Sequence, residues 1–179
     1  MRRALQGAGA GLLATVPMTI VMEALHERLP GEPPRPLPPR EITEAATVKA
    51  GVSRQLTERD VQDLTLVAHF GFGAACGAVF ALVAPERPAA AVGTGMLFGL
   101  GVWTASYAGG LPASGLRQSP RYDPAARSGL MIAAHLVWGL TAGLLLSGRR
   151  SKVKGETGSV RVPGRGRPGP ASIPGRARV

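Results

Sequence analysis

The chain has 179 residues, enough for one domain, with 21 Lys and Arg against 11 Asp and Glu and a formal net charge of +10. The excess lies in residues 149–179, which contain nine Lys or Arg and a single acid, Glu156. This distribution excludes a basic folded domain of the kind that binds nucleic acid, and the lone Cys76 excludes a disulfide framework.

Four long windows contain no Asp, Glu, Lys or Arg, namely residues 4–22, 64–85, 88–116 and 128–148. About 20 apolar residues cross the ~30 Å core of a bilayer as a helix, whereas a soluble bundle needs a charged face on each helix. The sequence therefore predicts an all-α integral membrane protein with four transmembrane helices in a Gly-rich bundle. Because the first apolar run is longer than a signal-peptide core and lacks a good cleavage site, we expect it to remain as a helix.

The first half of the chain predicts one span and a long connection. A helix is expected over about residues 4–27, followed by an external Pro-rich loop over 28–57. Within this loop, residues 30–40 read PGEPPRPLPPR, and their six prolines predict an extended polyproline-type segment. Residues 41–50 have only weak helical character before a glycine.

The remaining spans follow in close succession. A capping-box pattern at Thr57–Asp60 predicts the start of a helix that runs into the second span, about 64–84. A tight turn leads to the third span, about 89–110, and a short polar loop leads to the fourth, about 128–147.

We divide the chain into a transmembrane domain, residues 1–148, and a tail, residues 149–179, that is predicted to be disordered because it is rich in Gly, Pro and Arg. The Lys and Arg residues near the helix ends favour a multi-pass topology with both termini in the cytoplasm. We expect the basic residues from Arg149 to Arg178 to lie against anionic lipid headgroups. No specific nucleic-acid partner is expected, because the tail lacks aromatic residues that stack on bases.

Two of the three histidines lie in matching apolar strings, AHFGFGAACG at residues 68–77 and AHLVWGLTAG at 134–143. In each string, glycines follow the histidine four and eight residues later and share its helix face. The predicted topology makes both helices run from outside to inside. His69 and His135 are therefore expected at matching depth, roughly 8–10 Å below the outer surface.

The first and third spans offer small and polar residues at the same spacing. The first span carries a row spaced by four, Gly7, Gly11, Thr15, Thr19 and Glu23, and the third carries Gly95, Gly99, Trp103 and Tyr107. Small residues at this spacing let transmembrane helices approach closely. We therefore predict eight helix-packing glycines, Gly7, Gly11, Gly73, Gly77, Gly95, Gly99, Gly139 and Gly143. We also predict a polar intramembrane cluster of Glu23, His69, His135 and Tyr107, with both histidines facing the first span.

The repeated string has two interpretations. Membrane helices are rich in Gly and Ala, so the match can arise from composition alone. Alternatively, two helical hairpins arose by duplication, since Gly9–Leu13 and Gly93–Leu97 also match weakly. A duplicated pair of hairpins would place a site at the interface of the two halves.

The two histidines support several kinds of chemistry. They can act as interhelical hydrogen-bonding groups, as a site for protons or small solutes, as zinc ligands together with a carboxylate, or as the two axial ligands of a haem. We assign no resident metal and no cofactor. No Walker loop, HExxH, GxSxG or paired-carboxylate pattern is present in the sequence, so we do not expect an enzyme.

The segments PLPPR at Pro36–Arg40 and HLVW at His135–Trp138 resemble the uncharacterised bacterial inner-membrane proteins related to YagU. The resemblance covers roughly residues 5–147 and departs from that family in the shorter long loop and in the basic tail. It implies a small multi-pass protein of the bacterial inner (cytoplasmic) membrane and brings no activity, catalytic residue or cofactor with it.

The sequence thus predicts a small inner-membrane protein that scaffolds partners or handles protons or small solutes around an intramembrane Glu/His/His cluster. The alternative is a redox membrane protein that binds haem or a metal through His69 and His135. The lipid bilayer is the expected surrounding, and a second copy or another membrane protein is the class of partner left open.

Overall fold

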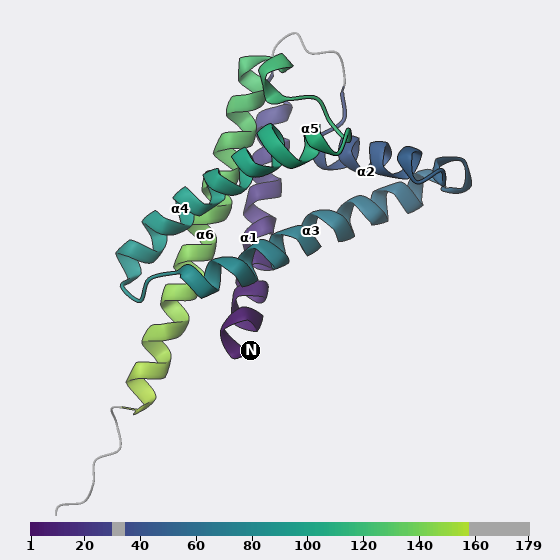
Figure 1. The fold of residues 1–179 in the computed structure, drawn as a ribbon. Coiled ribbons are helices and arrows are strands. Elements are labelled where there is room, and N and C mark those ends of the chain that lie inside the picture. Colours follow the sequence, from purple (N-terminus) through teal and green to yellow (C-terminus); the bar gives the residue numbers. More distant parts are fainter. Residues whose placement is uncertain (30–34, 158–179) are drawn as a thin grey trace, which may run out of the picture.

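The computed structural model of the protein describes residues 1–29 and 35–157, the last nine of them by their backbone alone. All secondary structure within these residues is helical (Figure 1). Four stretches are long and apolar enough to cross a membrane: Arg2–His26, Glu58–Val83, Pro88–Ala113 and Ala125–Gly148. This confirms the predicted fold class of an all-α membrane protein with four spans.

The first span is helix α1, Arg2–His26, which accommodates Pro17 in its interior. The hydroxyl groups of the two threonines that flank this proline donate hydrogen bonds to backbone carbonyls of the same helix. Thr15 donates to the carbonyl of Gly11 at 2.9 Å, and Thr19 donates to that of Thr15 at 2.8 Å. Such internal bonds let the helix carry polar side chains within an apolar surrounding.

The connection after α1 contains helix α2, Pro38–Lys49, and a short 3-10 helix η1, Ser53–Gln55. We expected an extended segment over residues 30–40, and this was wrong for its last three residues. Pro38 and Pro39 occupy the first turn of α2, where a proline has no backbone hydrogen bond to lose and its fixed φ suits a helix. Residues 30–34 lie outside the described part of the chain.

The second span, helix α3, Glu58–Val83, begins as predicted. The Thr57 side chain accepts a hydrogen bond from the Asp60 backbone N–H, and the Asp60 carboxylate accepts one from the Thr57 backbone N–H, which completes a capping box.

The third span is not one regular helix. Helix α4, Pro88–Trp103, passes into a π-helix η2, Thr104–Gly110, and then into one turn of α-helix α5, Leu111–Ala113. A π-helical stretch pairs each N–H with a carbonyl five residues back and widens the turn, and such stretches are frequent at functional sites.

The fourth span, helix α6, Ala125–Thr157, follows a 3-10 turn η3, Pro120–Tyr122. Residues 149–157 continue this helix, in contrast to the disorder that we expected from residue 149 onward. Residues 158–179, with their expected contact to anionic headgroups, lie outside the described residues.

The long helices form two hairpins. Helix α1 packs against α3, α4 packs against α6, and α1 and α6 join the two pairs. Helices α3 and α4 lie together near their connecting turn, where Phe80 packs on Phe98, and then diverge (Figure 1). The two hairpins are therefore joined mainly through α1 and α6.

Candidate intramembrane binding site

The eight predicted helix-packing glycines all lie where two helices cross. In the first hairpin, a Cβ on Gly7 would overlap the carbonyl oxygen of Gly77, and one on Gly11 would overlap that of Gly73. In the second hairpin, Gly95 and Gly139 would each meet the other's carbonyl oxygen. The remaining pair meets backbone as well, Gly99 at the His135 carbonyl and Gly143 at that of Ala91. Only glycine allows these main chains to come so close.

The glycines of the second repeated string face a different helix from the one that we predicted. Gly139 and Gly143 pack on α4, not on α1. The contacts of the two hairpins then correspond one to one, because Gly11 against Gly73 matches Gly95 against Gly139. This correspondence favours the duplication interpretation of the repeated strings, with α1 equivalent to α4 and α3 equivalent to α6.

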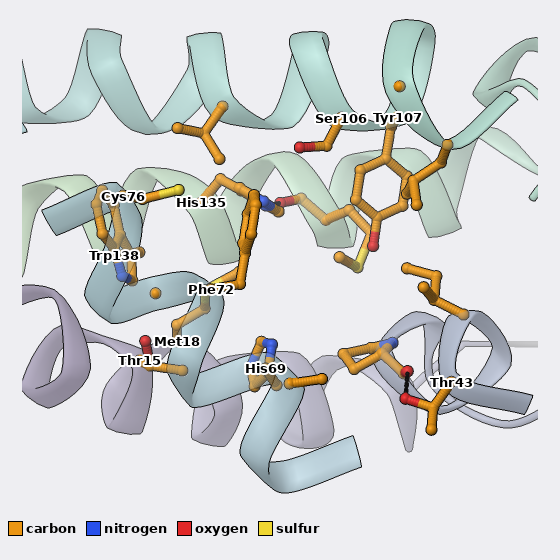
Figure 2. A pocket seen from close by; sticks show the side chains of 18 residues that line it. Thr15, Met18, Thr43, His69, Phe72, Cys76, Ser106, Tyr107, His135 and Trp138 are labelled. Carbon is orange, nitrogen blue, oxygen red and sulfur yellow. Dashed lines mark hydrogen bonds between the residues drawn. The ribbon is translucent and has the colours of Figure 1, made fainter. Parts of the chain in front are cut away.

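A cavity of about 390 Å³ lies between the hairpins, toward the end of the bundle that carries α2. Residues of α1, α2, α3 and α6 line it together with the third span (Figure 2). Its walls are mainly apolar, with Phe72 and Trp138 as the largest rings and no Asp, Glu, Lys or Arg among the described residues that line it. The size is in the range of small-molecule sites.

The cavity brings together three of the four residues of the predicted cluster: His69, Tyr107 and His135. In Figure 2 the Tyr107 hydroxyl points into the cavity from the third span, while His69 lies on the opposite side. The rings of Tyr107 and His135 meet edge to face, with 6.0 Å between their centroids. Tyr107 belongs to the π-helix η2, so the irregular turn of the third span carries a side chain of the cavity.

His135 is 6% exposed, and its protonation pattern follows from its neighbours. Its Nδ1 lies 2.7 Å from the carbonyl oxygen of Met131. Because a carbonyl only accepts hydrogen bonds, Nδ1 of the neutral ring carries the proton and Nε2 is an acceptor. Neither this Nε2 nor the hydroxyl of Tyr107, which is 5% exposed, has a hydrogen-bond partner among the residues that the structure describes.

His69 has the opposite tautomer. Its Nε2 lies 3.2 Å from Oγ1 of Thr19, whose own proton is donated to the carbonyl of Thr15. The threonine oxygen therefore accepts, and Nε2 of His69 donates, which leaves Nδ1 as an acceptor. Thr19 was part of the predicted polar row, but its role as the anchor of a histidine was not foreseen.

Glu23, the fourth residue of the predicted cluster, is not part of this cavity. It is exposed and lines a second depression, together with His26 and Arg40. His69 borders both spaces. Within the described residues, no group of three or more His, Cys, Asp or Glu side chains is placed to hold a metal ion, so the geometry gives no support to a site of two histidines and a carboxylate.

One hydrogen bond that the sequence did not indicate joins the two hairpins. The indole Nε1 of Trp138 donates to the carbonyl of Gly11 on α1 at 3.1 Å. The Trp138 ring stacks on Phe98, which in turn packs on Phe80 of the first hairpin. The position of Trp138 in the repeated string, three residues after the histidine, was the available signal.

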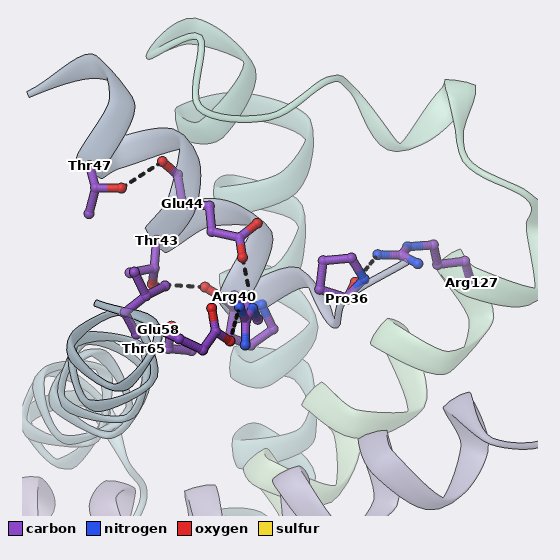
Figure 3. A network of polar contacts seen from close by, with 10 residues as sticks. Pro36, Arg40, Thr43, Glu44, Thr47, Glu58, Thr65 and Arg127 are labelled. Carbon is purple, nitrogen blue, oxygen red and sulfur yellow. Dashed lines mark hydrogen bonds and ion pairs between the residues drawn. The ribbon is translucent and has the colours of Figure 1, made fainter. Parts of the chain in front are cut away.

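An ion cluster holds α2 over the cavity. Glu41 of α2 accepts from Arg127 at 2.9 Å and from Arg117 at 3.4 Å, and Arg117 also pairs with Asp123 at 2.8 Å. Arg127, which is 2% exposed, donates in addition to the carbonyl of Pro36 (Figure 3). Charges with several partners tolerate such burial better than isolated ones.

Two further contacts extend this cluster. The guanidinium of Arg117 lies 5.1 Å from the centroid of the Tyr107 ring, so the cluster reaches the cavity wall. On the other side of α2, Arg40 donates to Glu44 and to Glu58 of α3, and these carboxylates raise the pKa of the Arg40 guanidinium. Helix α2 is thereby tied to both hairpins.

Comparison with known proteins places the chain in a family. No curated protein and no solved structure matches it. The family described as "Protein of unknown function (DUF1440)" matches residues 19–144, which include His69, Tyr107 and His135. Since this match covers more than half of the chain, the protein belongs to the DUF1440 family.

Proposed function

We propose that this membrane protein binds a small, uncharged and largely apolar molecule in the cavity between its two hairpins. The observation that carries the proposal is that Tyr107 and His135, both more than nine-tenths buried, direct hydrogen-bonding atoms without protein partners toward this space. Both residues line the cavity, so a ligand there can form hydrogen bonds with these atoms, each worth about 0.5–1.5 kcal/mol.

The lining of the cavity supports an uncharged ligand. An ion within an apolar cavity needs an opposite charge or several hydrogen bonds to offset its lost hydration. Among the described lining residues there is no acidic side chain and no Lys or Arg. A small solute therefore remains the expected ligand. We propose a binding protein and not an enzyme, because the described lining residues combine no carboxylate with the histidines.

The haem alternative gains less support from the contacts. Two axial histidines would both need a ring nitrogen directed at one iron, and the bond of Nε2 to Thr19 leaves only Nδ1 of His69 for that role. A scaffolding role has no contact of its own that favours it over ligand binding.

The finer location is also part of the proposal. We infer a bacterial inner membrane and cytoplasmic termini from the resemblance to YagU-related proteins and from the Lys and Arg residues beyond α6. The polar end with α2 would then face the periplasm. A membrane-impermeant thiol reagent tests this orientation in intact cells when Cys76 is replaced by Ala and a single cysteine is introduced at exposed Arg54 or Gln118. Labelling of either cysteine is expected, and protection of both would reverse the orientation.

The cavity is tested by filling it. We would purify the wild type and Val102→Trp, which enlarges a lining residue, in a mild detergent and quantify the small molecules that extract with each protein. The expected result is a molecule that accompanies the wild type and falls by about tenfold in the variant, the equivalent of ~1.4 kcal/mol.

The matched control is Val79→Trp, because Val79 is exposed on α3 and does not line the cavity. It should retain the molecule at the wild-type level. Equal amounts in all three proteins, or none in any of them after extraction from native membranes, would contradict the proposal.

A further inference from the structure

The hydrogen-bonding atoms of the cavity restrict the chemical class of the ligand, in addition to the limit that the cavity volume sets on its size. Nε2 of His135 and Nδ1 of His69 are both bare acceptors, since the other nitrogen of each ring donates to the protein. Tyr107 adds a hydroxyl that can donate and accept. A ligand that satisfies the two imidazoles must therefore supply hydrogen-bond donors, and an ether, ester or ketone alone cannot.

The side chains of the cavity walls also indicate the shape of the ligand. The rings of Phe72, Tyr107 and Trp138 line the same space, together with Met18 and Met131. Aromatic rings pack on one another in offset or edge-to-face geometry, and methionine sulfur also favours ring edges. This lining suits a planar ring better than a flexible chain.

The route of entry agrees with a ligand that dissolves in the bilayer. Helices α3 and α4 diverge beyond their connecting turn, so one side of the hairpin interface lacks the helix contact that closes the other side. His69 and Phe72 lie on α3, and Tyr107 lies on the continuation of α4. The polar atoms of the cavity are thus flanked by the two helices that separate.

We infer that the ligand is a lipid-soluble phenol, that is, an uncharged aromatic ring bearing a hydroxyl group. This inference rests on the proposed function and names the class of its ligand. The phenolic hydroxyl donates to Nε2 of His135 and accepts from the Tyr107 hydroxyl, while a second hydroxyl, where the ring carries one, donates to Nδ1 of His69. A simple alkylphenol and the reduced ring of a quinol share this chemistry.

The test compares ligands that differ only in the donor. Binding of 4-butylphenol and of its methyl ether, 4-butylanisole, to the full-length protein is measured by calorimetry in one detergent, with protein-free micelles as the blank. We expect the phenol to bind about tenfold or more tightly than the ether, a ratio that corresponds to one good hydrogen bond. Hydroquinone and its monomethyl ether, 4-methoxyphenol, measured in the same way, decide whether a second hydroxyl adds affinity.

Variants assign the donors and acceptors. His135→Phe removes the acceptor of the phenolic proton and should abolish the preference for phenol over ether. Tyr107→Phe removes only a hydroxyl that donates to the ligand oxygen, so it should weaken the binding of both compounds and leave the preference in place. His69→Phe should leave that preference intact and remove only the advantage of the quinol. His26→Phe is the matched control, because His26 does not line this cavity. Circular dichroism checks that each variant is folded. If His135→Phe fails this check, Tyr107→Phe, which keeps the ring, should still bind both compounds more weakly than the wild type, and unchanged binding of both would overturn the assignment.

The outcomes separate the two proposals. If phenol and ether bind equally and both are lost in Val102→Trp, the cavity binds ligands but the phenol assignment is wrong. If neither compound binds and a different molecule is extracted from the wild type but not from Val102→Trp, the assignment is again wrong and the proposed function stands. If no molecule distinguishes the wild type from Val102→Trp, both fail.

Discussion

The hairpin of α1 and α3 and the hairpin of α4 and α6 close over the same glycine contacts but hold their histidines in different ways. Counted from Gly11 and Gly95, the equivalent positions eight residues later are Thr19 and Trp103. Thr19 accepts from His69, whereas the indole N–H of Trp103 is buried without a hydrogen-bond partner among the described residues. His135 turns instead to a carbonyl of its own helix, and its Nε2 stays free for the cavity.

The two hairpins therefore share their helix crossing and differ in the surroundings of the histidine. The central crossing is glycine against glycine in both hairpins, Gly11 with Gly73 and Gly95 with Gly139. The surroundings of the histidine depend on one side chain on the facing helix, and a change there reverses the tautomer. If the two hairpins share their crossing but differ around the histidine, equivalent substitutions at the glycines should have equal effects and substitutions near the histidines should not.

The largest effect is expected at the ion cluster, which links the connection of the first hairpin to that of the second. Glu41→Gln leaves Arg117 and Arg127 buried opposite a neutral amide, and the loss of a partner from a buried ion pair costs about 3–5 kcal/mol. Unfolding in mixed micelles with increasing denaturing detergent measures this loss.

The control on the same helix is Glu44→Gln. Glu44 pairs with Arg40 at a part-exposed position, so its loss should change stability by no more than about 1 kcal/mol. If the two variants were equally stable, the cluster would not fasten the hairpins together.

The second largest loss of stability is expected at the glycines where the helices of each hairpin cross. Gly11→Ala and Gly95→Ala each place a methyl group against a facing carbonyl, and overpacking of this kind costs about 1–3 kcal/mol. The same unfolding assay should give similar losses for both, because the positions are equivalent. A loss in one hairpin only would break the correspondence between them.

Glycines two residues earlier provide the reference. Gly9→Ala and Gly93→Ala meet no atom within 4 Å outside their own helices. Alanine favours a helix over glycine by about 1 kcal/mol, so these two variants should be as stable as the wild type or more so.

A smaller effect is expected where a single hydrogen bond joins the hairpins. Trp138→Phe removes the bond to the Gly11 carbonyl and should cost about 1 kcal/mol, beyond any loss of packing. Trp103→Phe removes an indole N–H without a partner in the described structure and should cost less. An equal loss from both variants would mean that only ring packing matters.

The smallest expected change concerns the anchor of His69. Thr19→Val removes the acceptor of Nε2 and should cost about 0.6 kcal/mol, the average for such bonds between membrane helices. Nitrogen-15 NMR of the histidine ring should also show the loss of a single tautomer. Thr104→Val, whose hydroxyl bonds only to Leu100 of its own helix, should leave the His69 spectrum unchanged.

Much of the fold could be predicted from the sequence because a membrane-spanning helix has a distinct amino-acid composition. The absence of charge over about 20 residues identifies a span, and glycines spaced by four identify the face on which it packs. The spacing does not identify the neighbouring helix, so the contact of Gly139 with α4 could not be read from it.

The candidate site was predicted only in part, and the reason is geometrical. Residues four apart on a helix drift by about 40° per step, so a row from Gly11 to Glu23 turns through about 120°. Glu23 therefore leaves the face on which Thr15 and Thr19 contact α3. The contact of Glu41 with Arg117 spans 76 residues and joins helix α2 to the connection that precedes α6, and no local pattern indicates such a pair.

The crossing points of the helices and the walls of the cavity are mostly different residues of the same helices. The distance between paired helices is fixed by main chain against main chain, so larger or smaller side chains at the walls do not have to move the helices apart. Under the proposed function, substitutions at wall positions such as Phe72, Val102 and Met131 would change which molecule is bound, while the glycine contacts would keep the helix spacing.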